Sequence, residues 1–368
     1  MTEIFQMTDD FGPEKVVHIS DHAAGLRAIV VIDNTAIGPS VGGVRMAPDV
    51  TLEECARLAR AMSLKNAAAG LPHGGGKSVI TADPAMPLPE KAGLIRAFAQ
   101  AIAQLTDYVP GPDMGTNETC MAWIRDEIGR ALGLPRVVGG IPLDEIGATG
   151  LGVAAAANVA EEFTGIALDG ARVAIQGYGA VGRHAARYLA QEGARIVAVA
   201  DSRGTAHQPE GFDLSRLDAL KADGRAVIDY AGAEAADRDA VITADCDILV
   251  PAARPDIIDT SNAGAIRAKL IVQGANIPAT EEAEAELHDR GVMVIPDFIA
   301  NAGGVICASV EYRGGTESQA MTTIAEKIRK NTQEVLNEVR AHGTLPRAAA
   351  NALAESRLRE AMALQRAF

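Results

Sequence analysis

The segment Arg172-Val-Ala-Ile-Gln-Gly177-Tyr-Gly-Ala-Val-Gly182 decides the fold of the second half of this chain. Its first five residues are typical of a strand buried in a sheet, and helical spacing follows over residues 180–192. The three glycines allow a tight turn, a close approach of the backbone to a pyrophosphate, and close packing of helix on strand. The free N–H groups of the helix N-terminus favour a bound phosphate. The segment predicts a dinucleotide-binding site formed by Gly177, Gly179, Ala180, Val181 and Gly182.

An acidic residue stands where this pattern needs one. The next apolar strand is expected over residues 195–200, and Asp201 follows it, 24 residues after Gly177. A carboxylate there can accept hydrogen bonds from a ribose diol and repels a 2′-phosphate. We therefore expect NAD rather than NADP, although Arg203 offers a cation that a 2′-phosphate could use. The alternative, a glycine-rich turn that binds no ligand, does not explain why strand, turn, helix, strand and acid occur in this order.

Strands and helices alternate through the rest of this half. Further strands are expected at residues 247–250, 269–272 and 292–295, with helical stretches between them. This alternation predicts parallel βαβ units, as in a Rossmann-type domain. The polar stretch 202–239 interrupts the pattern and is expected to carry a variable loop or an insertion.

The first half also has an α/β pattern. A strand is expected at residues 26–32, a helix over 51–66 that begins with the capping pair Thr51 and Glu54, and a strand over 77–80. We therefore expect an α/β fold of two domains separated by a cleft. The substrate-binding and oligomerisation domain is placed at 1–145 and the Rossmann-type NAD-binding domain at 146–330. Helices over 317–342 and 348–368 close the chain, and residues 331–368 are expected to return to the first domain.

Composition excludes several classes of function. The 368 residues carry a formal net charge of −14, which argues against nucleic acid or an anionic membrane as the main partner. No apolar run reaches the roughly 18 residues of a membrane span, and the acidic start MTEIFQMTDDFGPEK is unlike a signal peptide. The four cysteines are widely separated, so we expect no disulfide framework, no metal site and a cytoplasmic protein.

Two lysines are unusual in a chain with 26 arginines and 8 lysines. Lys65 and Lys77 flank the sequence His73-Gly-Gly-Gly76. Lysine differs from arginine because it can lose its proton near neutral pH when it is desolvated or lies beside another cation. Catalysis is one interpretation; two surface lysines around a flexible turn are the other. Asp113, after the apolar residues 108–110, is likewise either a catalytic carboxylate or a turn residue.

A family resemblance decides between these interpretations. The chain resembles the glutamate, leucine, phenylalanine and valine dehydrogenases in unbroken order over roughly residues 25 to 315. The matching motifs are Gly42-Gly-Val-Arg45, Lys65-Asn66, Gly74-Gly-Gly-Lys77, Pro112-Asp113, Ala148-Thr-Gly150, the GxGxxG segment, Asp247-Ile-Leu-Val-Pro-Ala-Ala253, Gly274-Ala-Asn276, Pro296-Asp297 and Asn301-Ala-Gly-Gly-Val305. The resemblance implies an oxidoreductase that reversibly deaminates an L-amino acid to the 2-oxo acid and ammonia, as a homo-oligomer.

The resemblance also implies roles for individual residues. Lys65 is expected to bind the substrate α-carboxylate, Lys77 to polarise the developing carbonyl, and Asp113 to shuttle protons. Thr149, Ala252 and Asn276 match positions near the cofactor, and Asn276 also lies near the substrate. The full set of expected substrate-binding positions is Lys65, Val41, Gly42, Gly43, Gly111, Asn276, Val305 and Ala308.

The pocket for the substrate side chain differs from that of glutamate-specific members. Those members carry a lysine directly before the GGxR glycines and a serine three residues after the NAGGV valine, where this chain has Val41 and Ala308. A buried carboxylate without a partner costs several kcal/mol. Together with Gly111 and Val305, these residues predict an apolar substrate, with room for an aromatic side chain. His73 has no assigned role.

Two alternatives stay open from the sequence. One is a glutamate dehydrogenase that uses another cation for the γ-carboxylate. It is suggested by the segment Asp113-Met-Gly-Thr-Asn-Glu118, whose sequence resembles that of glutamate-specific members more than that of leucine-specific ones. The other is a non-catalytic sensor of amino acids or NAD on the same fold. The presence of Lys65, Lys77 and Asp113 together argues against a sensor, since a sensor needs no proton shuttle.

Overall fold

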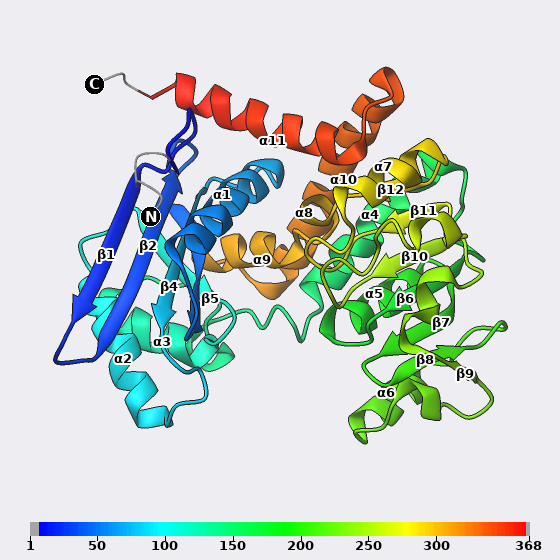
Figure 1. Ribbon diagram of the computed structural model, residues 1–368, viewed down its shortest axis with the longest axis horizontal. Coiled ribbons are helices and arrows are strands. Elements are labelled where there is room, and N and C mark those ends of the chain that lie inside the picture. The colour runs from blue at the N-terminus through cyan, green and yellow to red at the C-terminus, as the bar shows by residue number, and fades with distance from the viewer. Residues whose placement is uncertain (1–6, 366–368) are drawn as a thin grey trace. The chain divides into compact units, whose positions relative to one another are not determined.

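The computed structural model describes residues 7–365 (Figure 1). It divides into two compact units, and the chain passes between them four times. The first unit contains residues 1–142, 305–320 and 353–368, and the second contains 143–304 and 321–352. The expected division lay at 145/146, three residues from the observed one. The return of the chain differs more: residues 305–320 join the first unit, whereas 331–352 stay with the second.

The first unit is built on a five-stranded mixed sheet in the order β1-β2-β4-β3-β5. The two pairings that involve β2 are antiparallel, and β3 pairs in parallel with β4 and β5. Its elements are β1 Lys15–Asp21, β2 Leu26–Asn34, β3 Ser40–Ala47, α1 Leu52–Ala68, β4 Gly74–Thr81, α2 Leu88–Ala101, β5 Tyr108–Pro112 and α3 Glu118–Ile128. The predicted capping start is confirmed, because the Thr51 hydroxyl accepts a hydrogen bond from the Glu54 N–H.

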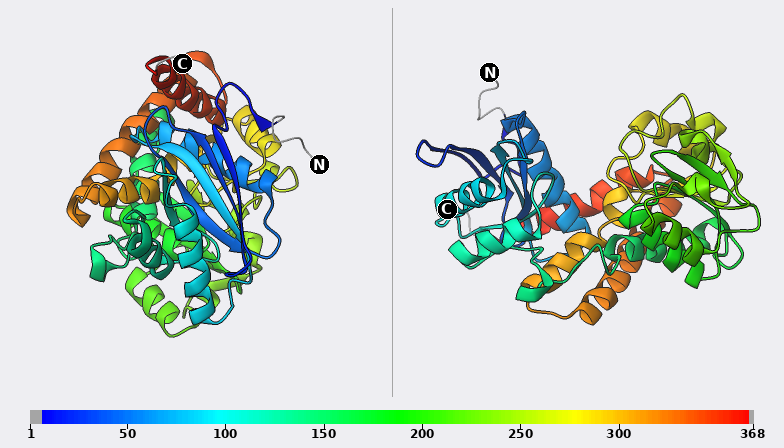
Figure 2. Two further views of the ribbon diagram at one scale, coloured as in Figure 1. Left: turned by 90° about the vertical axis from the view of Figure 1, so that its left-hand side faces the viewer. Right: turned by 90° about the horizontal axis from the view of Figure 1, so that it is seen from below.

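The helices of the first unit cover both faces of this sheet (Figures 1 and 2). Helix α1 packs on one face through Cys55 and Ala59, which contact Val31 and Val79 of the sheet. Helices α2 and α3 cover the other face, where the larger core contains Phe98 and other fully buried side chains. The face under α1 also carries Lys77, one of the predicted site residues.

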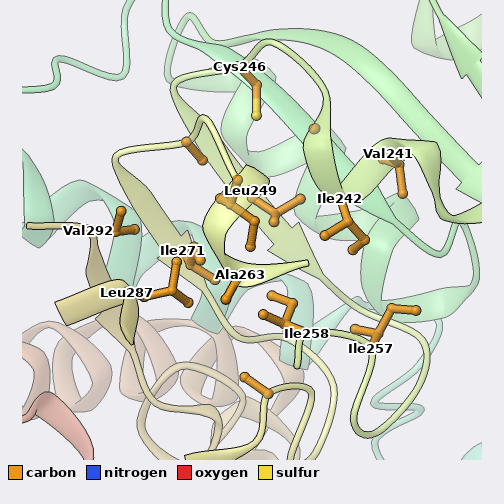
Figure 3. Close-up of a cluster of buried hydrophobic side chains, with 14 of the residues drawn as sticks. Val241, Ile242, Cys246, Leu249, Ile257, Ile258, Ala263, Ile271, Leu287 and Val292 are labelled. Atoms are coloured by element: carbon orange, nitrogen blue, oxygen red, sulfur yellow. The ribbon is translucent and has the colours of Figure 1, made fainter. Parts of the chain in front are cut away.

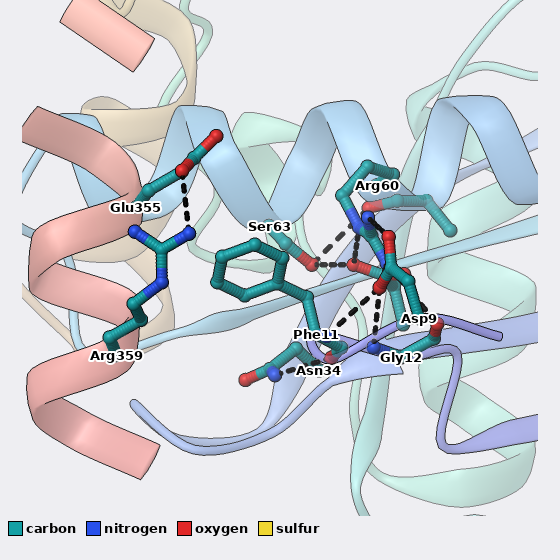
Figure 4. A network of polar contacts seen from close by, with 10 residues as sticks. Asp9, Phe11, Gly12, Asn34, Arg60, Ser63, Glu355 and Arg359 are labelled. Atoms are coloured by element: carbon teal, nitrogen blue, oxygen red, sulfur yellow. Dashed lines mark hydrogen bonds and ion pairs between the residues drawn. The ribbon is translucent and has the colours of Figure 1, made fainter. Parts of the chain in front are cut away.

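The N-terminal segment is fixed to α1 by a polar cluster (Figure 4). Arg60 donates hydrogen bonds to Asp9 at 2.6 and 2.7 Å and to Asp33 at 2.9 and 3.1 Å. The guanidinium groups of Arg60 and Arg359 both lie over the ring of Phe11, at 5.5 and 4.8 Å from its centroid. Residues from both ends of the chain therefore belong to the first unit.

The second unit contains a seven-stranded sheet in the order β12-β11-β10-β6-β7-β8-β9. The five strands from β12 to β7 are parallel, as predicted, and β8 and β9 add an antiparallel edge. That edge lies in the polar stretch 202–239. The longer elements are α4 Ala148–Thr164, β6 Arg172–Gln176, α5 Ala180–Gln191, β7 Arg195–Asp201, β8 Gly204–His207, α6 Leu214–Ala222, β9 Glu234–Ala236, β10 Ile248–Pro251, β11 Leu270–Val272, α7 Glu281–Asp289 and β12 Met293–Ile295.

Four helices follow the last strand: α8 Asp297–Ala300, α9 Gly303–Tyr312, α10 Glu317–His342 and α11 Pro346–Ala363. A buried apolar cluster covers one face of the second sheet (Figure 3), where Leu249 and Ile271 of β10 and β11 contact side chains such as Ile258 and Leu287. This parallel sheet with strands in Rossmann order confirms the predicted fold class.

Candidate active site

Lys77 and Asp113 meet over the glycine of a strand that lies between them. Strand β3 pairs with β4 on one side and with β5 on the other, so about 10 Å separates the backbones of the outer strands. The Lys77 Nζ nevertheless lies 2.5 Å from the Asp113 Oδ2. A Cβ on Gly43 would lie 2.7 Å from the Asp113 Cβ and 3.1 Å from the Lys77 Nζ. Glycine at position 43 therefore leaves the space in which the ion pair forms.

Arg45 completes this charged group. It lies two residues after Gly43, hence on the same face of β3. Its Nε donates to Asp113 at 3.0 Å, and its Nη1 pairs with Glu54 of α1. Burial disfavours the charged form of Asp113, but the positive charge of Lys77 and its hydrogen bond outweigh burial and lower the pKa of this carboxyl. Asp113 is therefore a carboxylate that stays ionised between two positively charged side chains.

The end of α1 brings Lys65 to the same region. Lys65 is partly buried in the last turn of this helix. The next residue, Asn66, donates from Nδ2 to the Gly74 carbonyl at 2.7 Å, which joins the helix end to the strand of Lys77. A Cβ on Gly75 would lie 2.0 Å from the Ser63 nitrogen, so α1 can approach β4 only over glycine. Gly75 thus allows the close approach of α1, which carries Lys65, to the strand that carries Lys77.

Apolar side chains surround the expected substrate pocket. Val41, Val109 and Leu132 form a buried cluster, and Ala308 of α9 packs against it. The structure thus brings Val41 and Ala308 together from positions far apart in the sequence, while Val305 is partly buried one turn earlier on the same helix. Gly111 pairs with Gly43 in the sheet, and a Cβ there would meet only the Leu132 Cβ, at 3.7 Å. Position 111 borders this cluster and has room for a methyl group.

His73 is a buried residue that links the GGGK strand to α9. Its Nε2 lies 2.9 Å from the Ser309 hydroxyl. Its ring packs edge-to-face with that of Tyr312, with 5.8 Å between the ring centroids. Burial, assisted by the nearby charge of Arg313, lowers the pKa of His73 to about 4. At neutral pH this imidazole is uncharged, so it does not offer a cation for a substrate carboxylate. Arg45, a cation of the same unit, is already paired with Asp113 and Glu54.

The GxGxxG turn lies at the carboxyl end of β6, beside β10. The chain continues from β6 to β7 on one side of β6, whereas β10 lies on its other side, and this is the topological switch point at which open α/β sheets bind ligands. Gly177 has φ +97°, and a Cβ there would lie 2.4 Å from the Ala253 Cβ. A Cβ on Gly179 would meet no atom within 4 Å, and no side chain caps α5. Open space and free helix N–H groups fit the pyrophosphate of a dinucleotide.

Asp201 ends β7 as predicted, but its carboxylate already has three donors. Lys221 of α6 donates to it at 2.6 Å, and the Val227 and Arg203 N–H groups donate at 2.9 Å. Although burial opposes ionisation, the hydrogen bond from Lys221 contributes most to lowering the pKa of Asp201. The side chain therefore holds α6 and the Val227 turn to the sheet, and only 9% of it is exposed. Lys221 was not foreseen, because it comes from the polar insertion.

The remaining motifs of the second unit meet at the same edge. Thr149 opens α4 beside the NAGG glycines, since a Cβ on Gly303 would lie 3.0 Å from the Thr149 nitrogen. Asn301 of that motif donates from Nδ2 to the Asn276 Oδ1 at 2.9 Å. The Ala252 N–H donates to the Gln176 carbonyl at 2.7 Å, which places Ala252 directly beside the GxGxxG turn. The structure thus places Ala252 beside the dinucleotide cradle, Thr149 beside Gly303, and Asn276 beside Asn301.

Two further features of residues 7–365 bear on the class of protein. None of their helices combines the length and the hydropathy of a membrane span. The cysteines at positions 55, 120, 246 and 307 are buried free thiols.

Comparison with known families agrees with this arrangement. The model for the Glu/Leu/Phe/Val dehydrogenase dimerisation domain matches residues 13–130, and the Glutamate/Leucine/Phenylalanine/Valine dehydrogenase model matches residues 139–366. Together they cover most of the chain. The chain belongs to the glutamate/leucine/phenylalanine/valine dehydrogenase family. It is an NAD(P)-dependent amino-acid dehydrogenase, which acts on a CH–NH2 group, and the resemblance inferred from its motifs is confirmed.

Individual relatives of this dehydrogenase differ in the substrate that their names give. The glutamate dehydrogenase of Aeropyrum pernix is 39% identical over 323 residues, which cover 82% of this chain and 77% of the relative. Among solved structures, a hetero-hexameric glutamate dehydrogenase from Thermus thermophilus in a leucine-bound form superposes with a TM-score of 0.84 at 30% identity, covering 97% of this chain and 91% of the other. The L-tryptophan dehydrogenase of Nostoc punctiforme superposes with a TM-score of 0.79 at 25% identity, covering 98% of this chain and 100% of the other.

Sequence reasoning missed one side chain that organises the dehydrogenase's first unit. Glu311 of α9 accepts hydrogen bonds from the Leu134 N–H at 3.1 Å and the Ile141 N–H at 2.8 Å. It therefore closes the loop 134–141 and fixes the helix that carries Ala308. A signal was available: Glu311 is an acidic residue in the otherwise apolar helix Gly303–Tyr312, and such a residue needs buried donors.

Proposed function

We propose that this dehydrogenase reversibly deaminates an L-amino acid with an uncharged, apolar side chain, using NAD. The observation that carries the proposal is the position of Val41 and Ala308 in one apolar cluster on the unit that holds Lys77 and Asp113. An amino acid whose α-carbon faces the ion pair would place its side chain among these apolar residues. Aliphatic or aromatic side chains gain free energy from such contacts, at about 0.8 kcal/mol for each buried methylene.

Each charged residue has a distinct task in this reaction. Lys65 binds the substrate α-carboxylate as a fixed cation. Lys77 polarises the carbonyl that develops at the α-carbon, and Asp113 moves protons between the amino group and water. Arg45 holds the Asp113 carboxylate from the side opposite Lys77. When bound, the nicotinamide supplies the redox chemistry.

NAD is the proposed cofactor because Asp201 is ionised at the end of β7, where the adenosine ribose of a Rossmann-bound dinucleotide lies. A 2′-phosphate would be repelled by this carboxylate. The ammonium of Lys221 pairs with this carboxylate and reduces the repulsion, and relatives named for NAD and for NADP both match this chain. Isothermal titration with each cofactor tests the preference, and tighter binding of NADP would overturn it.

Glutamate is the second candidate substrate. Several relatives near 40% identity are named glutamate dehydrogenases, so the comparisons favour glutamate over the apolar side chain expected from the sequence. Physical reasoning opposes it: a γ-carboxylate among Val41, Val109, Leu132 and Ala308 would be buried without a partner, at a cost of several kcal/mol. His73 is uncharged at neutral pH, and Arg45 is engaged elsewhere.

A panel of L-amino acids distinguishes the two candidates. We expect phenylalanine, leucine or another apolar amino acid to exceed glutamate in kcat/KM for the wild-type enzyme. The double variant Val41→Lys with Ala308→Ser should shift the preference toward glutamate, because it adds a counter-charge and a donor. A wild-type enzyme that prefers glutamate over every apolar amino acid would overturn the proposed side-chain class but not the dehydrogenase reaction.

We further propose a homo-oligomer that forms through the first unit. A groove of about 760 Å³ follows the outer side of α1 and is largely apolar. Its lining residues are Met7, Pro13, Asp33, Thr51, Leu52, Glu53, Ala56, Arg57, Arg60, Ala61 and Leu64. The unit that carries it matches a model named for dimerisation. Light scattering of the purified protein tests this proposal, and a monodisperse monomer would overturn it.

A further inference from the structure

Arg347 donates four side-chain hydrogen bonds to three residues of the second unit. It lies in the first turn of α11, with 19% of its side chain exposed. Its Nε and Nη2 donate to the two carboxylate oxygens of Glu284, each at 2.7 Å. Its Nη1 donates to Asp297 at 2.9 Å, and Nη2 also donates to the Gln273 Oε1 at 2.9 Å. One guanidinium thus joins α7, the end of β11 and the start of α8.

The contacts of Arg347 are strong because the groups around it are buried. The side chains of Glu284 and Asp297 are 7% and 8% exposed, so each needs a partner for its charge. Gln273 is fully buried and donates from Nε2 to Glu284 at 2.7 Å. A planar guanidinium satisfies both carboxylates at fixed angles, which a lysine cannot do. Removing Arg347 would leave two buried carboxylates without their shared cation.

Asp297 connects Arg347 to the loop that carries Asn276, because it accepts hydrogen bonds from both Arg347 and Ile277. Its Oδ2 accepts a hydrogen bond from the Ile277 N–H at 2.9 Å, while its own N–H donates to the Gln273 Oε1 at 2.9 Å. Ile277 has φ +47°, in the left-handed region that a β-branched residue rarely adopts. Its side chain is 56% exposed, so packing contributes little to holding this conformation. Two hydrogen bonds therefore hold the strained residue: its N–H donates to Asp297, and its carbonyl accepts from the Asp256 N–H at 2.9 Å.

We propose that Arg347 is a positioning residue of the dehydrogenase, which acts through Asp297 and Ile277 to fix the backbone that presents Asn276. This inference rests on the proposed role of Asn276 beside the nicotinamide and the substrate. The Asn276 side chain is held from the other side by Asn301, whose Nδ2 lies 2.9 Å from the Asn276 Oδ1. Without Arg347, the Asp297 carboxylate would turn away from buried Glu284, release Ile277 and allow the amide of Asn276 to move.

Amide hydrogen exchange tests the structural part of the inference in the full-length enzyme. We expect exchange over residues 274–277 to accelerate by about tenfold or more in Arg347→Met, because the loop opens locally. Arg347→Lys keeps the charge without the fork and should give an intermediate rate. Arg290→Met is the matched control: Arg290 donates to the Ile266 carbonyl in the same unit at 2.8 Å and has no bond to this network. It should leave exchange over residues 274–277 unchanged.

Kinetics test the functional part. Arg347→Met should lower kcat by about tenfold with a smaller change in the KM for the amino acid, since the Lys65 site is untouched. Titration with NAD, which needs no turnover, should show weaker binding. If Arg347→Met fails to fold, Asp297→Asn is tested instead. The amide of Asn has one acceptor oxygen, so when that oxygen accepts from the Ile277 N–H, its NH2 group must face the guanidinium of Arg347.

Two results would overturn the inference: unchanged exchange at residues 274–277 in both the Arg347 and Asp297 variants, or equal acceleration in Arg290→Met. Failure of the wild-type enzyme to reduce NAD with any of the amino acids tested would instead contradict the proposed function. The exchange data would still decide the role of Arg347.

Discussion

Lys77 lies on β4 and Asp113 directly follows β5, yet their side chains are 2.5 Å apart over Gly43 of β3, the strand between β4 and β5. The contact exists because the intervening strand has no side chain at that point. Strand β4 contributes the cation, the residue after β5 the carboxylate, and β3 the space between them. The following expectations depend on this arrangement.

Removal of either member of the ion pair should abolish most of the activity. Lys77→Ala and Asp113→Asn should each lower kcat by at least about a hundredfold, the low end for lost general acid–base catalysis. Binding of NAD should change little, because the cradle at Gly177 lies in the other unit. Steady-state kinetics with cofactor titration provide the measurement. Near-wild-type turnover in either variant would refute the assignment.

A methyl group at position 43 should damage catalysis more than folding. The new Cβ would lie 2.7 Å from the Asp113 Cβ and force the ion pair apart. We expect Gly43→Ala to lower kcat by roughly tenfold or more, since lost general acid–base catalysis costs at least that much. The free energy of unfolding, measured with urea, should fall by only about 1–3 kcal/mol, as for other overpacked sites. Wild-type turnover in Gly43→Ala would contradict the geometry.

Gly111→Ala is the matched change on the neighbouring strand. Its Cβ would meet only the Leu132 Cβ at an ordinary distance of 3.7 Å, so stability should change little. The added methyl reduces the space beside the apolar cluster. Relative kcat/KM should therefore fall more for phenylalanine than for leucine or valine. Equal effects on aromatic and aliphatic substrates would place Gly111 outside the side-chain pocket.

Lys65→Ala should weaken substrate binding selectively. A charge-assisted hydrogen bond contributes about 1.5–3 kcal/mol, so the KM for the amino acid should rise by about tenfold or more. NAD affinity, measured by titration without amino acid, should stay close to that of the wild type. Lys91→Ala is a control, because Lys91 lies on α2, which covers the other face of the sheet, and donates to the Pro84 carbonyl before that helix. An unchanged KM in Lys65→Ala would exclude the anchor role.

His73 should make the folded protein sensitive to acid. Its pKa is lowered from 6.5 to about 4, so the unfolded chain takes up a proton first as the pH falls. Above pH 6.5, His73 does not lower the free energy of unfolding. As the pH falls from 6.5 toward 4, this free energy declines by at most about 1.4 kcal/mol for each pH unit. His73→Gln should flatten the pH dependence of the unfolding free energy in this window. Parallel curves for wild type and His73→Gln would contradict this expectation.

Local sequence patterns predicted much of the fold because they act over short distances. The strand at 172–176 and the helix at 317–342 lie where their patterns placed them. The polar stretch 202–239 was expected to carry a variable loop or an insertion, and its antiparallel strands β8 and β9 could not be foreseen. Short polar edge strands lack the apolar periodicity that identifies a buried strand.

The sequence by itself determined the family, the two α/β units and the residue types of the site, since glycines, lysines and an aspartate at fixed spacings dictate the local turns and the available chemistry. Only the tertiary structure decided which side chains meet. It joined Lys77 to Asp113, gave Asp201 a partner in Lys221, and placed Ala308 of α9 against Val41. Such contacts depend on strand order and on helices that return from distant parts of the chain, and no local pattern specifies these.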